Sequence, residues 1–203
     1  MANTNAPRGL IPVNGAYSQP WSDGVELFWH DAGDSQAIFV GDLVTRTGAS
    51  YFMNQGGTVQ SVPIAAQAVS GGIFDGVCVG TLAITRDSPI YGAASTGIGI
   101  FVCTDPNADF WVQDANSGTP LTANDIGLNI NVLVNQGSTV TGMSGMVLDN
   151  TSEAGTNTLD LKILGQWLSP DNDLGSAVGT GAAAGKWRVR INRHRNANQI
   201  AGA

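Results

Sequence analysis

One short stretch of the chain carries the residue types of a nucleotide-binding motif. The stretch GAAAGKW (181–187) contains the Gly-Lys pair of a phosphate-binding loop. Such a loop needs a glycine five residues before that Gly and a Ser or Thr directly after the Lys, but this chain has Thr180 and Trp187 there. The backbone cradle and the magnesium-binding hydroxyl are therefore both missing, and the sequence does not predict a phosphate site.

A second stretch, GMSGM (142–146), is close to a serine nucleophile elbow. The second glycine falls one residue early, and Met146 occupies its position. A serine triad would also need His30 or His194 as the base, and nothing in the sequence places either near Ser144. A glycine-rich turn is the better interpretation, and we expect no catalytic residues and no enzymatic activity.

Neither a metal site nor a cofactor site is predicted. The stretch DNDLG (171–175) begins like a calcium loop, but Ser176 replaces the required glycine and Ala182 replaces the terminal glutamate. Cys78 and Cys103 are the only cysteines, and each lies in an apolar run. Buried reduced thiols are favoured over a disulfide.

The elements that must position any site are predicted to be short strands. The 27 glycines, the many β-branched residues and the small charged fraction of 12% favour tight turns between strands over long helices. We therefore predict an all-β fold, a β-sandwich of jelly-roll type or a distorted barrel. The expected strands are short apolar or alternating runs at 25–30, 37–45, 58–66, 76–85, 97–104, 110–114, 127–134, 158–168 and 186–192.

Charge is distributed unevenly along the chain. Residues 1–173 hold all sixteen acids and four of the nine basic residues, which gives 4 − 16 = −12, whereas residues 174–203 hold five basic residues and no acid. An acidic body with a basic end favours binding to copies of itself or to another acidic protein. Nucleic acid is a poorer partner, because the acidic body would repel phosphate. No stretch is long and apolar enough for a membrane span or a signal peptide.

Residues 1–22 are predicted to form an extended N-terminal arm. This segment has three prolines, no acid and no helical or alternating pattern. It either lies on a neighbouring subunit or folds back on its own body as a terminal strand, and both alternatives stay open. Under the first alternative, its contact residues are Arg8, Leu10, Pro12 and Trp21.

The rest of the chain, residues 23–203, is predicted to be one β-rich domain. A Gly/Ala-rich linker (175–185) leads into a basic C-terminal strand (186–192). In this strand Trp187, Val189 and Ile191 alternate with Arg188, Arg190 and Asn192, which predicts one apolar face and one basic face. We expect the basic side to contact a partner through Arg188, Arg190, Arg193 and Arg195. The alternative is a solvated face whose arginines cover apolar neighbours.

Several segments together resemble a known family, the cement or head-decoration proteins of tailed bacteriophages. In chain order they are MANTNAPRGLIPV, AIFVGDLV, FVCTDPNADFWVQDA, LTANDIGLNINVLVNQGSTVTGMSGMVLDN, LDLKILGQWLSPDNDLG and KWRVRINRH. The resemblance implies a jelly-roll or related β fold. It also implies many copies, as dimers or trimers, bound to the major capsid protein on the outer surface of a mature icosahedral capsid after synthesis in the host bacterial cytoplasm.

A carbohydrate-binding β-sandwich module is the competing hypothesis. Trp29, Trp111 and Tyr91 have the ring faces that stack on sugars, although aromatic residues on strands also serve cores and interfaces.

Overall fold

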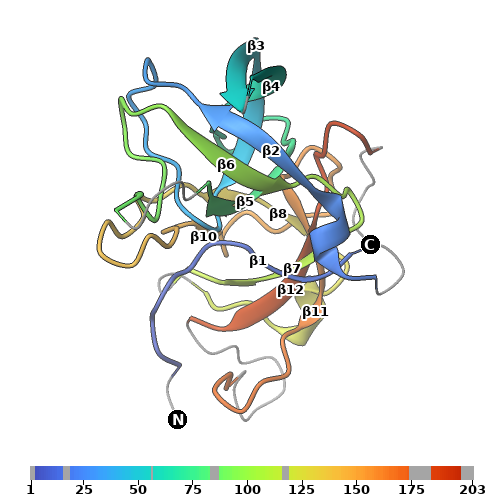
Figure 1. Cartoon of the computed structure of the whole chain (residues 1–203). Helices are drawn as coiled ribbons and strands as arrows, with labels where there is room; N and C mark the ends of the chain where they lie inside the picture. The colour runs from blue at the N-terminus through green and yellow to red at the C-terminus, as the bar shows by residue number, and fades with distance from the viewer. Residues whose placement is uncertain are drawn as a thin grey trace.

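The computed structural model describes residues 3–15, 19–55, 57–82, 87–115, 119–173 and 184–197. The all-β prediction is confirmed, because the only helical segments there are the short 3-10 turns η2 (Trp21–Gly24) and η3 (Ala123–Asp125). The strands form two five-stranded sheets and one small sheet (Figure 1). They are β1 (Ile11–Asn14), β2 (Val25–His30), β3 (Leu43–Gln55), β4 (Thr58–Gln67), β5 (Gly76–Thr81), β6 (Ile98–Cys103), β7 (Asp109–Gln113), β8 (Asn129–Ile130), β9 (Val132–Leu133), β10 (Val147–Leu148), β11 (Leu161–Gln166) and β12 (Lys186–Ile191).

One sheet closes into a barrel in the order β2-β4-β3-β5-β6. All of its pairs are antiparallel except β2 with β4, which run parallel where Trp29 lies opposite Ile64. The barrel interior is packed with buried apolar side chains, including Phe28, Ile100 and Val102. Closure removes most of the free strand edges that an open sheet would leave.

The second sheet is open and has the order β1-β7-β12-β11-β8, with every pair antiparallel. Its inner face packs on the barrel through the larger of the two apolar cores, in which Trp187 and Phe110 have no exposed surface. The predicted inward set of the last strand, Trp187, Val189 and Ile191, is buried as expected. In the order of this sheet, the basic strand β12 is the central strand.

Strands β5 and β6 join the two cores because their alternate side chains enter different ones. Val77 and Cys103 pack in the core between the sheets, whereas Cys78 and Val102 point into the barrel. This alternation follows directly from the period of two along a strand. The two sheets are consequently parts of a single packed unit.

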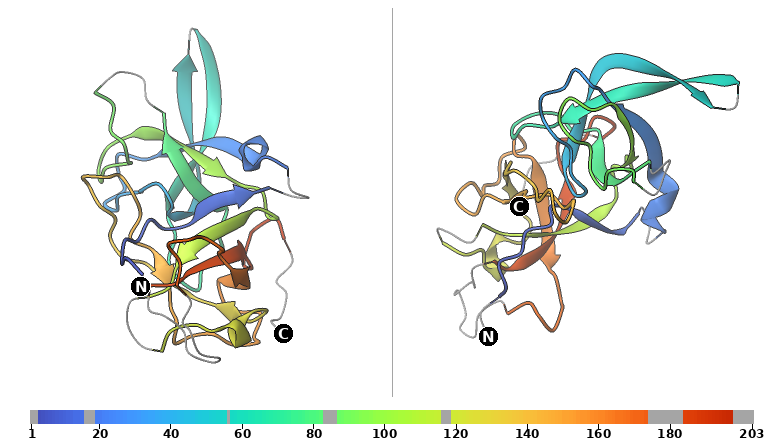
Figure 2. Two further views of the ribbon diagram at one scale, coloured as in Figure 1. Left: turned by 90° about the horizontal axis from the view of Figure 1, so that it is seen from below. Right: turned by 60° about the vertical axis from the view of Figure 1, so that its left-hand side comes forward.

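A long hairpin extends from the barrel well beyond the rest of the molecule (Figure 2). β3 and β4 pair antiparallel from Ser50 opposite Pro63 to Gln55 opposite Thr58. A shift of register between Arg46 and Ser50, together with Gly48 at φ 86°, marks the point where the hairpin leaves the barrel wall. We call residues 47–63 the ribbon.

The N-terminal arm folds back on its own chain, the second of the two alternatives. β1 pairs with β7, and Leu10 donates its backbone N–H to the carbonyl of Gly41 at 2.9 Å. Gly9 and Gly41 cross so closely that a Cβ on either would collide with a carbonyl oxygen of the other segment. Only glycine fits at this crossing, because both residues also have φ in the left-handed region, 68° and 97°.

Strand boundaries depart most from the prediction in two places. The strand expected at 37–45 begins at Leu43 and continues to Gln55, which forms the ribbon, and the one expected at 127–134 is divided into β8 and β9. β1 was expected only as one of the two alternatives for the arm, since its pairing with β7 is set by tertiary contacts, and the two-residue β10 was not expected. The predicted Gly/Ala-rich linker lies outside the described residues except for Ala184 and Gly185.

Candidate interaction surfaces

Cations and a tryptophan lie together on the outer face of the open five-stranded sheet, β1-β7-β12-β11-β8. Directly opposed residues of an antiparallel pair point to the same side, so the register places Ile11, Trp111 and Arg188 in one row. The next row holds Asp109, Arg190 and Lys162. We call this surface the cationic face; its members are Arg8, Trp111, Lys162, Lys186, Arg188 and Arg190.

Two of these cations are held by acids of the same face. Arg190 donates from both Nε and Nη2 to Oδ1 of Asp109, at 3.0 and 2.8 Å. Lys186 pairs with Asp171, whose pKa is lowered to about 2 by that contact, and its ammonium lies 5.8 Å from the centre of the Trp111 ring. These contacts fix the side chains and leave fewer donors for a partner.

Arg188 differs from its neighbours. Its side chain is exposed, and within the described part of the chain it makes no hydrogen bond or ion pair. A strand at the centre of the sheet nevertheless fixes its backbone on both sides. Arg188, like the exposed Arg8, is therefore a predicted contact residue whose guanidinium makes no hydrogen bond or ion pair within the described part of the chain.

The first residues of the arm cross one end of the cationic face. Ala6 donates its backbone N–H to Oε1 of Gln113 at 3.0 Å, and Gln113 donates to Oδ1 of Asn5 at 2.7 Å. The arm, the open sheet and the loop that follows β11 line a pocket of about 310 Å³. It is lined by Thr4, Ala6, Arg8, Trp111, Trp167, Ser169, Asp171 and Lys186.

The other arm residues predicted to contact a partner have different positions. Leu10 is fully buried in the core between the sheets, so it has no surface to offer a partner while the arm stays in place. Pro12 is half-buried in β1 opposite Phe110, and Trp21 packs against the same core from η2. Only Arg8 of this set is exposed.

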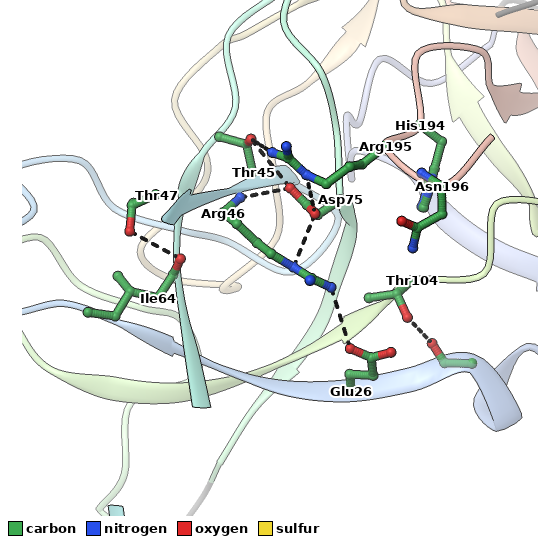
Figure 3. Close-up of polar contacts among 11 residues, drawn as sticks. Glu26, Thr45, Arg46, Thr47, Ile64, Asp75, Thr104, His194, Arg195 and Asn196 are labelled. Atoms are coloured by element: carbon green, nitrogen blue, oxygen red, sulfur yellow. Dashed lines mark hydrogen bonds and ion pairs between the residues drawn. The ribbon is translucent and has the colours of Figure 1, made fainter. Parts of the chain in front are cut away.

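Arg193 and Arg195 do not lie on the cationic face. Arg195 donates from Nε to Oδ1 of Asp75 at 2.8 Å, and Arg46 approaches the same oxygen at 3.1 Å. Figure 3 shows both side chains converging on Asp75, with Arg46 continuing to Glu26 at 3.7 Å. Asp75 is only 1% exposed, so two cations neutralise a carboxylate that would be costly to bury alone.

The same segment is clamped through its backbone. Phe74 donates to the carbonyl of Arg193 at 2.9 Å, and Arg195 donates to that of Phe74 at 2.8 Å. Arg193 also donates from its guanidinium to the carbonyls of Gly71 and Thr158. These contacts attach the end of the described chain to the rest of the protein, and the partner contacts expected of Arg193 and Arg195 stay a prediction.

Asn192 was also expected on the outer side of the last strand, but it is buried. Its amide donates to the carbonyls of Leu159 at 2.9 Å and Asn157 at 3.2 Å. The apolar and polar alternation ends with β12 at Ile191, so period-two reasoning no longer applies at the next residue.

The aromatic residues proposed for sugar stacking are mostly engaged within the protein. Trp29 stacks on Tyr51 with ring centres 3.9 Å apart, and Tyr91 stacks on Phe39 at 4.7 Å. Trp111 lines the pocket under the arm, which it shares with Trp167. Trp167 was not singled out from the sequence, which places it inside the strand expected at 158–168, whereas β11 ends at Gln166.

The two cysteines and the serine of the GMSGM stretch are buried. Cys78 and Cys103 are free and buried, and burial raises the pKa of their thiols to about 12 and about 11. Ser144 is buried and accepts a hydrogen bond from the backbone of Met146. Among the described residues there is no group of three or more potential metal ligands, and no helix there is long and apolar enough to span a bilayer.

Comparison with known proteins gives no relative from which a role could be transferred. No protein family, no curated protein and no solved structure matches the chain. The function must therefore be argued from its own surfaces.

Proposed function

We propose that this protein is a structural, non-enzymatic decoration protein of a tailed bacteriophage capsid. It binds in many copies to the outer surface of the mature icosahedral shell, bridges major capsid subunits and stabilises the expanded lattice. Its location is the virion, after synthesis in the host bacterial cytoplasm, and it acts as a dimer or trimer. The observation that carries the proposal is the cationic face of an otherwise acidic protein.

The cationic face has the properties of a docking surface. Arg8, Lys162, Lys186, Arg188 and Arg190 are five of the nine basic residues of a chain whose net charge is −7. They stand on a packed sheet, so their positions are fixed before binding and little conformational entropy is lost. Asp109 and Asp171 pair with two of the five cations, so the face keeps an excess of positive charge, which favours an acidic partner surface and accelerates its encounter.

Repetition on a shell would multiply a modest contact. Each copy that binds two neighbouring capsid subunits converts the second contact into an intramolecular step at high effective concentration. If only the expanded lattice presents both sites, binding shifts the shell towards the expanded state by mass action. This mechanism needs surfaces rather than a catalytic centre.

Co-sedimentation with expanded, undecorated capsids tests the proposal, with unexpanded procapsids as the control. We expect saturable binding to expanded shells alone. Arg188→Ala should weaken that binding and reduce its dependence on salt, whereas Arg188→Lys, which keeps the charge, should retain most of it. Absence of binding to either shell would remove the capsid role.

The pocket between the arm and the sheet supports a second candidate function, binding of a carbohydrate. Two indole rings, Trp111 and Trp167, together with the exposed Arg8, match the mixture of flat apolar surface and polar groups that holds sugars. A glycan array with the intact chain and with Trp167→Ala distinguishes the two functions. Glycan signals that vanish in this variant, with capsid binding absent, would favour the carbohydrate module.

A further inference from the structure

The ribbon is notable for its lack of charge. Residues 47–74, which include the whole ribbon, contain no Asp, Glu, Lys, Arg or His, although sixteen acids occur in the rest of the chain. A segment that projects into solvent ordinarily carries charged residues that keep it soluble and prevent association. The ribbon carries none of this protection.

The β3 edge of the ribbon has no strand beside it in the described part of the chain. β5 pairs with β3 only at Leu43 and Val44, before the ribbon begins. From Ser50 onward, β3 is paired with β4 alone. A regular edge of this kind is a template for one more strand, which would bind mainly through backbone hydrogen bonds.

Apolar side chains are exposed on one side of the ribbon. Phe52 lies opposite Ser61 and Val59 lies opposite Asn54, so all four side chains point to the same side. Phe52 is 69% exposed and Val59 is 61% exposed. On the other side, Tyr51 stacks on Trp29 and is less exposed, at 38%. The exposed side therefore offers an apolar surface next to the open edge.

Charge identifies the occupant of this edge. An acidic or a basic partner would gain no electrostatic attraction from an uncharged strand, and it would have to desolvate its own charges against that strand. The ribbon of a second copy is equally uncharged, and because it projects, two ribbons can meet while the acidic bodies, each part of a chain of net charge −7, stay apart (Figure 2).

We propose that the ribbon is a self-association surface, in which β3 of one copy pairs antiparallel with β3 of a second copy across a twofold axis at Phe52. A twofold axis makes the contact isologous, so Phe52 faces the partner's Phe52 and Ser50 faces the partner's Asn54. The two β3 strands join the hairpins into one four-stranded sheet. This inference is independent of the capsid role, because it concerns the free protein in solution.

Cysteine cross-linking tests the pairing and its register. In Phe52→Cys, the two introduced thiols face each other at a Cβ separation of about 5 Å, close enough for a disulfide after a small adjustment. Native Cys78 and Cys103 are fully buried and do not compete. Under mild oxidation we expect a covalent dimer to form at least about tenfold faster than in Val140→Cys, which places a thiol on a loop side chain that is 87% exposed.

A second control lies within the ribbon. Ser50→Cys should cross-link slowly, because residue 50 faces residue 54 of the second copy, and the two introduced thiols at position 50 therefore lie far apart. The double variant Ser50→Cys, Asn54→Cys should restore fast cross-linking. Equal rates for Phe52→Cys, Ser50→Cys and Val140→Cys would show random collision and overturn the proposal.

Sedimentation of the intact chain over a dilution series provides an independent test. The unmodified protein should pass from monomer to dimer as concentration rises, whereas Phe52→Lys, which sets two like charges opposite each other, should stay monomeric with an unchanged circular dichroism spectrum. A monomer at every concentration, or a dimer that Phe52→Lys leaves intact, contradicts the inference. Neither result alters the capsid test, which measures binding to a different surface.

Discussion

The cationic face and the ribbon are two exposed surfaces of one chain, built on opposite principles. The cationic face stands on a buried core, and two of its cations pair with Asp109 and Asp171. The ribbon has no charge and projects beyond the barrel. A surface with fixed charges recognises a partner of complementary charge, whereas an open strand edge recognises an extended backbone. The difference shows how one β protein can separate binding of a foreign surface from binding of itself.

Residues beneath the cationic face should contribute far more to the free energy of unfolding than residues of the ribbon. Trp187 lies fully buried beneath the cationic face, and Phe52 is exposed on the ribbon. We expect Trp187→Ala to lower the free energy of unfolding by about 3–5 kcal/mol, because it empties a large volume of the core. Phe52→Ala should change it by less than about 0.5 kcal/mol. Urea denaturation of both variants measures these changes. Equal losses of unfolding free energy would contradict the expected difference between the two regions.

A change of pH should alter the stability of the open sheet, which contains a buried carboxyl, but not the pairing of the uncharged ribbon. Asp114 follows β7 and is fully buried. Burial raises the pKa of its carboxyl to about 7, and the nearby donor groups of Leu121, Gly185 and Trp187 offset this rise only in part. A group whose pKa is higher in the folded state stabilises the fold below its unfolded value near 4. That contribution is lost as the pH rises towards 7, on the order of 3–4 kcal/mol.

Asp114→Asn should remove this pH dependence, since an amide does not titrate. Urea midpoints measured at about pH 4.5, 6 and 8 should fall more steeply for the unmodified chain than for the variant. Parallel curves for the two proteins would refute a buried carboxyl with a raised pKa. In the same series, the cross-linking rate of the ribbon should follow only the ionisation of the introduced thiol.

The contact between the barrel and the end of the described chain gives a smaller effect. Asp75→Asn keeps the shape of the side chain but leaves Arg46 and Arg195 without their common carboxylate. We expect a loss of about 2 kcal/mol, a value typical of hydrogen bonds to charged groups, because both guanidinium groups remain partly solvated. Thermal melts measure it. A matched change, Asp87→Asn, alters an exposed acid and should have little effect.

The smallest expected change in stability belongs to the residue with the largest expected role in binding. Arg188→Ala removes an exposed side chain that has no partner in the described structure, so the unfolding free energy should change by less than about 0.5 kcal/mol. Attachment to expanded capsids should nevertheless weaken most at low salt, where charge attraction is least screened. Unchanged attachment across salt concentrations would remove the cationic face from the proposed function.

The sequence alone predicted the last strand well, because its side-chain period is a local property. Trp187 and Val189 are buried, and Arg188 is exposed, as that period requires. The partners of the other arginines were out of reach. Arg190 pairs with Asp109 and Arg195 with Asp75, residues far away along the chain, and only the sheet order brings them together. A cluster of cations in a sequence thus does not reveal which of them are already neutralised.

The ribbon shows a different limit of sequence reasoning. The strand beginning at Thr58 was predicted, but nothing local indicates that β3 continues past the barrel wall. Strand propensity describes each residue and not whether a neighbouring strand will cover it. The missing charges over residues 47–74 were the available signal. An absence of this kind becomes informative once the segment is known to be exposed.

The position of β12 at the centre of its sheet has a consequence for the order of events during synthesis. Strands β2 to β6 all precede residue 104, so the barrel strands are complete long before β12 leaves the ribosome. β7 and β11 have no strand between them until then. Asp75 meanwhile has Arg46 but not Arg195. The nascent chain should therefore pass through a stage with a formed barrel and an unfinished sheet, which presents an apolar surface to chaperones until translation ends.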